Sequence, residues 1–316
     1  MAGYGMQGHV MFAFQNSFGT SNVASLQALS VTEESITLGI DQVVEAGMYA
    51  RFGESPYHTG FQTIEGDVTQ EASPIGLGYF LKSALGLTST ISAAGTQTHI
   101  FKSTAADFDA NVATTPLTLE VNRDVGSAAV YYDMAGNTFA LNIANGELLT
   151  ATLGVLGGKF TKEAANSPTF PTASPLKWDQ SSISFGGANV LDIQDLTLNI
   201  NNNLENRFTL QNCNVPFKIK RTAQQQIELS GTFIFQQHSY WDAFIAQTEH
   251  SLVMHWAGAE SPNSLKIDIP KLRFKSFEPS ISGPGIIEAA FTAGAMFDAS
   301  SNTAIEFTLI NTVTAY

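Results

Sequence analysis

The chain has 316 residues and a formal net charge of −13, with 15 Lys and Arg residues against 28 Asp and Glu residues. A hydrophobic fraction of 44% with 22 Phe excludes a disordered chain, and a single cysteine excludes a disulfide scaffold. The acidic charge argues against a protein that grips DNA phosphates. Only 14% of the residues are charged, against about 25% in an average domain, which indicates that much of the surface faces other protein.

The opening residues and the most apolar stretch give no targeting or membrane signal. The opening MAGYGMQGHVMFAF lacks a basic region and a long apolar run, so we expect no signal peptide. Residues 148–156 form the most apolar stretch, but threonines interrupt it, so we expect no membrane span. The single Cys213 suits a reducing cytosol. The length fits one large domain or two ordinary domains of roughly 100–200 residues each.

Alternation of apolar and polar residues predicts strands along the whole chain. The predicted strands span residues 10–14, 36–40, 117–121, 196–200, 227–235 and 265–269. Two helices are predicted. The first covers residues 74–85, with Gly86 after it, and the second covers residues 239–248, with Ser239 as its cap. Few helices among many short strands predict a mainly β fold.

Residues 161–175, TKEAANSPTFPTASP, hold three of the 11 prolines and show no alternation. Such a break is typical of a linker, which divides the chain into a first module at 1–160 and a second at 176–316.

The order of elements repeats on the two sides of this linker. In each half an alternating strand leads into a long loop, a second strand and then a helix. Gly66 and Gly231 lie 165 residues apart, and so do Tyr79 and Phe244. Downstream, residues 117–121 correspond to residues 265–269 in this reading. We therefore predict two duplicated β-sandwich or barrel modules, each with one short α-helix and a long loop. The alternative is that any two β domains share strands and turns.

Chemistry-bearing motifs are missing from the sequence. The six histidines are scattered without paired-ligand spacing, and one cysteine cannot build a structural zinc site. Neighbouring acids arise by chance in a chain with 28 of them, and no GxSxG, P-loop or GxGxxG pattern occurs. We expect no catalytic residue, no cofactor and no metal, and hence a protein that is not an enzyme.

Two long segments have the composition of interfaces. Residues 41–61 mix Met, Tyr, Phe and Arg, and residues 201–226 carry a basic cluster in an acidic chain. Loops beyond about 12–15 residues are usually functional or disordered, and these residue types are enriched at interfaces. The alternatives are an ordinary surface loop and solvated charge. The candidate interface residues are Val43, Val44, Met48, Tyr49, Arg51, Phe52, Tyr57, Phe61, Phe208, Phe217, Lys218, Lys220 and Arg221.

The segments SSISFGGANVLDIQDLTLNINNNLENRFTL and IELSGTFIF, followed by the short helix, resemble the tail tube (major tail) proteins of long-tailed, siphovirus-like bacteriophages. The opening GYGMQGHVMFAFQNSFGT and the later IEGDVTQEASPIGLGYFLKSALG are similar to the start of the same family. The resemblance covers most of the chain. It implies a structural protein of the virion tail, made in the host cytoplasm.

The resemblance also implies how such a protein works. The inner sheet of each sandwich joins those of its neighbours into a ring, and rings stack into a hollow tube that conducts DNA. The partners are other copies of the chain and the tail terminator, distal tail and tape-measure proteins. DNA passes during ejection without specific binding, and no membrane is involved. The long loop after the early strand reaches an adjacent subunit or ring.

Family rings usually hold six tube modules, so a two-module chain implies a trimer with pseudo-sixfold symmetry. Stacking is heterologous and does not close, so it gives a filament. Both halves are acidic, which predicts an electronegative lumen. The lumen candidates are Glu65, Asp67, Glu120 and Glu228. Two other classes remain open: another virion β-protein, such as a decoration, capsid or shaft subunit, and a carbohydrate-active β-sandwich with two facing carboxylates.

Overall fold

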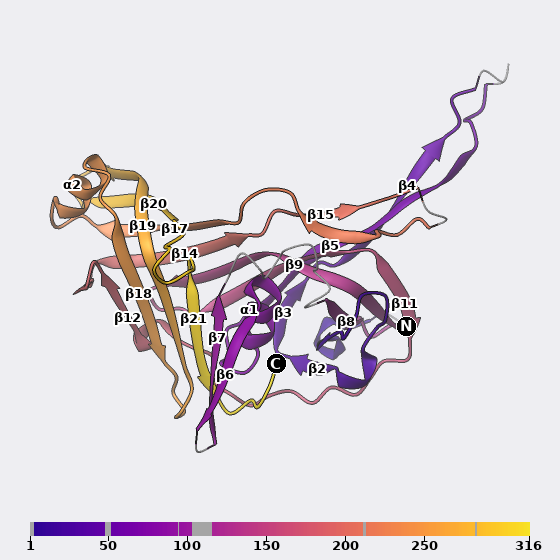
Figure 1. Cartoon of the computed structure of the whole chain (residues 1–316), viewed down its shortest axis with the longest axis horizontal. Coiled ribbons are helices and arrows are strands. Elements are labelled where there is room, and N and C mark those ends of the chain that lie inside the picture. Colours follow the sequence, from indigo (N-terminus) through magenta and orange to yellow (C-terminus); the bar gives the residue numbers. More distant parts are fainter. Residues whose placement is uncertain (1–2, 48–51, 94, 103–115, 211–212, 282) are drawn as a thin grey trace.

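The computed structural model describes residues 3–47, 52–93, 95–102, 116–210, 213–281 and 283–316. Strands dominate this part of the chain, and the two α-helices in it are α1 (Leu77–Leu85) and α2 (Ser239–Ile245). Short 3-10 turns lie at Gly5–Gln7, Val23–Ser25 and Trp178–Gln180. The prediction of a mainly β protein is confirmed (Figure 1).

One antiparallel sheet runs through both halves of the chain, and we call it the long sheet. Its neighbouring strands are, in order, β4, β5, β10, β9, β14, β17, β20 and β19. The strands span Thr37–Val44 (β4), Tyr57–Glu71 (β5), Thr150–Gly157 (β10), Ala128–Ala144 (β9), Ile193–Asn201 (β14), Gln226–Ile234 (β17), Glu288–Ala295 (β20) and Ser264–Ser280 (β19). The β9–β14 pair joins the two halves of the chain within this sheet.

The second layer of the first half starts from β9, which is long enough to belong to both layers. The first part of β9 pairs with β8 (Leu117–Asn122) and with β11 (Lys159–Glu163). Strand β8 pairs with β1 (His9–Phe14), and β1 pairs with β2 (Gln27–Leu29). Strand β3 (Val31–Glu34) pairs with the end of β5 beside β4.

The second half uses β19 in the same way. Its first part pairs with β18 (His250–Ala257) and β21 (Glu306–Asn311). Strand β18 pairs with β12 (Ser181–Phe185), and β12 pairs with β13 (Ala188–Asn189). Strand β21 also pairs with β7 (Thr96–Lys102), which forms a hairpin with β6 (Leu87–Ala93). A hairpin of the first half thereby extends a sheet of the second.

A single apolar cluster fills the space between the layers and continues through both halves. Its largest fully buried side chains include Phe12, Phe80, Phe139, Phe233 and Trp256. The C-terminal Tyr316 packs edge-on against Tyr79 of α1, with ring centroids 5.1 Å apart. Burial of this size is the main favourable term in folding, so the two halves are expected to unfold together.

The six predicted strands and both predicted helices are confirmed. The predicted ranges fall on β1, β4, β8, β14, β17 and β19. The bounds of β1, β8 and β17 agree within a residue, whereas β4, β14 and β19 extend three or more residues beyond the predicted ranges, and β19 continues to Ser280. Helix α1 begins at Leu77, three residues after Pro74, and the amide of Gly86 caps it by donating to the carbonyl of Lys82. The predicted linker begins inside β11, because residues 161–163 pair with β9.

The two long segments are less irregular than expected. Residues 41–44 and 57–61 belong to β4 and β5, which continue as a projecting two-stranded arm (Figure 1, upper right). In the other segment, β15 (Leu204–Arg207) and β16 (Lys218–Arg221) form a hairpin. The expectation of loops is wrong for these residues. The arm exposes both faces, so its sequence lacks the one-sided alternation that identifies a strand.

Candidate functional site

Side chains of the long sheet alternate between the core and an outer face, and we call the latter the polar face. Most of its positions carry small hydroxyl, amide, methyl or hydrogen side chains. Along the strand order these are Thr37, Gly39, Thr69, Thr150, Thr152, Gly154, Thr138, Ala140, Asn142, Thr197, Asn199, Asn201, Ser230, Thr232, Ala290, Thr292 and Ser276. Hydroxyls of adjacent strands bond to one another, as Thr69 and Thr152 do at 2.9 Å. The result is a surface made mainly of small, uncharged side chains.

The charges on the polar face are mostly negative. Its acids are Asp41, Glu65, Asp67, Glu71, Asp195, Glu228, Glu278 and Glu288, whereas its cations are Arg273 and Lys275. Both cations are paired: Lys275 Nζ lies 3.4 Å from Glu228, and Arg273 lies 2.9 Å from Glu249. A face of this sign repels a phosphate backbone.

Three of the four lumen candidates lie on the polar face. Glu65 and Asp67 are exposed on β5, and Glu228 is half-buried on β17 beside Lys275. These three therefore share one surface, although β5 and β17 are separated by three other strands.

Glu120 is different, because it is fully buried on β8. Its carboxylate accepts a hydrogen bond from the backbone amide of Asn166 at 2.9 Å and another from the Asn166 side chain, and it lies 3.4 Å from His9 Nε2. The expectation that Glu120 faces outward is wrong. The alternation of β8 is real, but the segment after β11 folds over its polar side.

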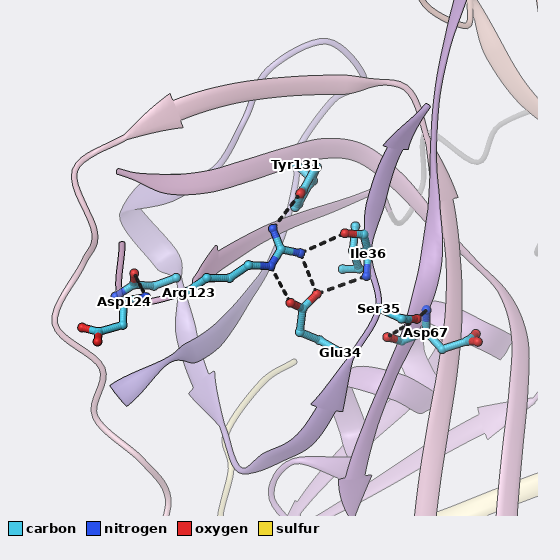
Figure 2. Close-up of polar contacts among 8 residues, drawn as sticks. Glu34, Ser35, Ile36, Asp67, Arg123, Asp124 and Tyr131 are labelled. Carbon is cyan, nitrogen blue, oxygen red and sulfur yellow. Dashed lines mark hydrogen bonds and ion pairs between the residues drawn. The ribbon is translucent and has the colours of Figure 1, made fainter. Parts of the chain in front are cut away.

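A clamp at the junction of β3 and β4 fixes the backbone beside Asp67 (Figure 2). The Glu34 carboxylate accepts hydrogen bonds from Arg123 Nε and Nη2 at 2.7 and 2.9 Å and one from the backbone amide of Ile36 at 3.1 Å. This bidentate contact raises the pKa of Arg123 above its usual range. Ser35 and Asp67 then exchange hydrogen bonds of 2.9 Å through their amides. In Figure 2 the Asp67 carboxylate points away from the clamp.

The arm carries the first set of candidate interface residues. Val43, Val44, Tyr57 and Phe52 are more than half exposed, and Tyr57 reaches 61%. Met48, Tyr49 and Arg51 lie outside the described residues. The arm rises at the end of the molecule opposite to α2 (Figure 1). Exposed apolar side chains on a projecting hairpin are typical of an interaction site.

The β15–β16 hairpin packs on the chain's own first half instead of projecting. Leu204 and Ile219 form a small cluster with Ala135, and Leu156 packs against it. The buried Asn202 donates to the carbonyls of Ala84 at 2.7 Å and Gly136 at 3.0 Å.

The basic cluster of this segment is partly engaged inside the chain. Arg221 donates to the carbonyl of Asn202 at 3.1 Å, and Lys218 Nζ lies 5.2 Å from the ring centre of Phe217, which is itself 46% exposed. Lys220 is exposed on β16 and thus accessible in the single chain.

The two segments meet, which the sequence did not predict. The rings of Phe61 and Phe208 stack with centroids 4.1 Å apart, and the amide of Gln62 donates to the carbonyl of Asn214 at 2.8 Å. An open groove of about 810 Å³ adjoins this contact, with Val43 and Cys213 among its lining residues. The base of the arm is thus held by the second segment.

Within the described ranges, no group of three or more His, Cys, Asp or Glu side chains has the arrangement of a metal site. No described helix has the length and apolar character needed to cross a membrane.

Comparison with known proteins supplies the family. A family profile described as phage tail tube protein matches residues 5–295. No curated protein matches the chain at a significant level. Because the profile covers nearly the whole chain, the protein belongs to the phage tail tube family, and it is a non-enzymatic structural component of the virion tail.

Proposed function

We propose that this protein forms rings of three chains with pseudo-sixfold symmetry, which stack into the hollow tail tube that conducts phage DNA into the host. The proposal includes two duplicated modules, at 1–160 and 176–316, joined by a linker at 161–175. The observation that carries it is the order in which strands pair in the two halves.

The two halves pair their strands in the same order. Strand β5 lies between β4 and β10, as β17 lies between β14 and β20. Strand β9 pairs with β10, β8 and β11, as β19 pairs with β20, β18 and β21. The β8–β1–β2 series matches β18–β12–β13, and a helix follows β5 and β17 alike. An agreement this extensive favours duplication over chance similarity of two β domains.

Particular residues support the same assignment. A Cβ atom on Gly66 would lie 2.6 Å from the backbone of Ile36, and one on Gly231 would lie 2.3 Å from the carbonyl oxygen of Asp195. Both glycines thus allow a close approach at the same place in each module. The pairing changes one correspondence: β18, not residues 265–269, takes the place of β8, because those residues belong to β19.

The width of the long sheet favours three chains over six. Each chain contributes the eight strands of the long sheet. With a strand spacing of about 4.8 Å and a tilt of about 40°, about 24 strands close into a barrel roughly 50 Å across, whereas about 48 strands give roughly 100 Å. The smaller barrel leaves a passage suited to a single DNA duplex.

The polar face is proposed as the lumen wall, with Glu65, Asp67 and Glu228 among its charges. Small neutral side chains offer a translocating duplex few groups to bind, and the acids repel its phosphates. The arm, with its exposed Val43, Val44 and Tyr57, is proposed to contact an adjacent subunit or ring. Tail terminator, distal tail and tape-measure proteins are the proposed partners besides the chain itself.

Electron microscopy of the purified protein tests the proposal. We expect rings or tubes with a central hole that admits a duplex, and a mass of three chains for a single ring in native mass spectrometry. A ring mass of six chains would overturn the stoichiometry. Compact monomers under every assembly condition would overturn the tube function itself.

A further inference from the structure

We propose that β4 of one chain pairs antiparallel with the end of β19 of the next chain, in the register of the β9–β14 junction inside the chain. In this register Leu38 lies opposite Ile281 of the next copy, Gly39 opposite Ser280, and Ile40 opposite Pro279. The inference rests on the proposed ring of two-module chains. It names the strands and residues that close the ring.

The template is the junction that joins the two modules within the chain. There Leu198 pairs with Leu141, Asn199 with Ala140, and Ile200 with Phe139. The two pairs that face the core, Leu198 with Leu141 and Ile200 with Phe139, are all 3% exposed or less. A ring of repeated modules needs the same junction again between the second module of one chain and the first module of the next.

The pairings of β17 and β5 show which residues of β4 correspond to those of β14. Leu198 pairs with Leu229 in the second module, and Leu38 pairs with Ile64 in the first. Since Ile64 and Leu229 are 165 positions apart, like Gly66 and Gly231, Leu38 takes the place of Leu198. It follows that Ile40 takes the place of Ile200.

The same comparison shows which residues at the end of β19 correspond to those of β9. Phe139 pairs with Leu153, which itself pairs with Val68. Pro279 pairs with Ala289, which itself pairs with Phe233. Val68 and Phe233 are again 165 positions apart, so Pro279 takes the place of Phe139. Two residues further on, Ile281 takes the place of Leu141.

The two edge strands of the long sheet, β4 and β19, expose apolar side chains that the proposed junction would bury. In the described part of the chain, β4 pairs with β5 alone, and β19 beyond Leu272 pairs with β20 alone. Ile40 is 51% exposed where its counterpart Ile200 is 1% exposed, and Ile281 is 80% exposed where Leu141 is 3% exposed. An exposed strand edge with apolar side chains is a template for pairing.

A second copy is the occupant that fits both edges. Each chain offers one β4 edge and one β19 edge, so the contact is heterologous and propagates until the ring closes. No other partner is needed to cover either edge.

Two features make this junction weaker than its template. Pro279 lacks an amide proton, so the ladder has one donor fewer. Asp41 comes opposite Glu278 on the polar face, and like charges directly opposite each other weaken a sheet. Such protection of an edge keeps free chains from pairing indiscriminately before assembly.

Disulfide trapping in assembled tubes tests the register. In a Cys213→Ser background, Gly39→Cys is combined with Ser280→Cys, since facing Cβ atoms in a sheet lie about 4.5–5.5 Å apart, close to disulfide reach. Oxidation should give a covalent species of three chains as the main product on a non-reducing gel. The matched control combines Gly39→Cys with Glu288→Cys, which lies one strand further away on β20 and should give monomers.

The outcomes separate this inference from the proposed function. Tubes in which neither pair cross-links, or in which the Glu288 pair cross-links instead, would overturn the register and leave the tube function standing. Absence of tubes from the parent chain would instead overturn the proposed function.

A second variant tests the inference in case the cysteine pair itself prevents assembly. Ile40→Asp should leave a folded monomer that forms no rings, because a carboxylate would be buried at the junction. Val125→Asp, at a residue 58% exposed in the β8–β9 turn, should assemble as the parent does. Normal rings from Ile40→Asp would overturn the inference.

Discussion

Phe61, at the base of the arm, stacks on Phe208, which follows β15, with ring centroids 4.1 Å and ring planes 28° apart. Phe61 lies in the first half of the chain and Phe208 in the second, so this contact lets the second half set the direction of the arm. An arm that reaches a neighbouring subunit must keep its direction before the neighbour arrives, because ordering it later would weaken association.

Phe208→Ala should therefore loosen the base of the arm. An aromatic pair contributes about 0.5–1.5 kcal/mol beyond its buried area, which corresponds to roughly 2- to 12-fold faster amide exchange at a site that opens locally. The probe is the amide of Gln62, which donates to Asn214 beside the stack. Phe170→Ala, at a phenylalanine with the same 47% exposure as Phe61, should leave this exchange unchanged. Equal exchange in both variants would show that the stack does not hold the arm.

Shortening the arm should separate folding from polymerisation. Val44 pairs with Tyr57, so an Asn-Gly turn in place of residues 45–56 closes the hairpin without changing its register. Because the removed residues lie beyond the described contacts of the core, we expect the parent's unfolding midpoint in urea. Electron microscopy should show no tubes, since the stacking contact is gone. Tubes of ordinary length from this variant would exclude a stacking role for the arm tip.

The sequence predicted those strands that bury one face. The run at 196–200 was readable because Leu196, Leu198 and Ile200 enter the core while the residues between them do not. The arm was not readable, since beyond Ile40 both of its faces are exposed and no period of two remains. Whether a predicted strand is covered on one side or on both depends on segments distant in the sequence.

Glu120 and the polar face both show that alternation within one strand does not predict its surroundings in the fold. Glu120 sits at a polar position of an alternating strand, but Asn166 covers it from 46 residues away. Most positions of the polar face carry small side chains such as threonine and asparagine, and no single strand identifies them as part of one surface. Only the pairing of eight strands brings them onto one surface, and alternation carries no information about which strands are neighbours.

Reversing charges on the polar face should slow DNA ejection without preventing assembly. Glu65→Lys, Asp67→Lys and Glu228→Lys together turn a repelling wall into one that binds phosphate. The delay should shrink as salt is raised, because the Debye length falls from about 10 Å at 0.1 M to about 3 Å at 1 M. Ejection from reconstituted particles, followed by a DNA-binding dye, measures the delay. The matched control places three lysines at acids that lie off the polar face: Glu163, Asp179 and Glu260. Ejection at the parent rate from tubes that carry Glu65→Lys, Asp67→Lys and Glu228→Lys would refute the lumen assignment.

Glu120 should behave as a structural residue and not as a lumen charge. Glu120→Ala leaves both donors of Asn166 and the ring of His9 without their buried partner, so we expect a loss of about 2–4 kcal/mol in the free energy of unfolding. Glu65→Ala, at an exposed position, should change it by less than about 0.5 kcal/mol. Urea denaturation of the two variants side by side checks the difference. Equal stabilities would mean that the Glu120–Asn166 contact contributes nothing to the fold.

Acidification should destabilise the chain through His99, a fully buried residue of β7 that contacts the C-terminal segment. Its Nδ1 lies 3.0 Å from Thr90 Oγ1, its Nε2 lies 2.9 Å from the carbonyl of Val313, and the ring of Tyr316 packs edge-on 4.8 Å away. Burial lowers the pKa of His99. Below the unfolded value of about 6.5 the unfolded chain therefore binds a proton that the folded chain does not, and stability falls with pH by at most about 1.4 kcal/mol per unit.

The comparison that isolates this effect is His99→Gln against the parent, with urea midpoints measured between pH 7.5 and 5. Glutamine keeps a donor and an acceptor without titrating, so the variant should lose less stability across this range than the parent. His250, whose pKa burial also lowers, adds a separate slope, and His250→Gln should remove that share independently. If His99→Gln and the parent lose stability in parallel as the pH falls, His99 is not the group that couples protonation to unfolding.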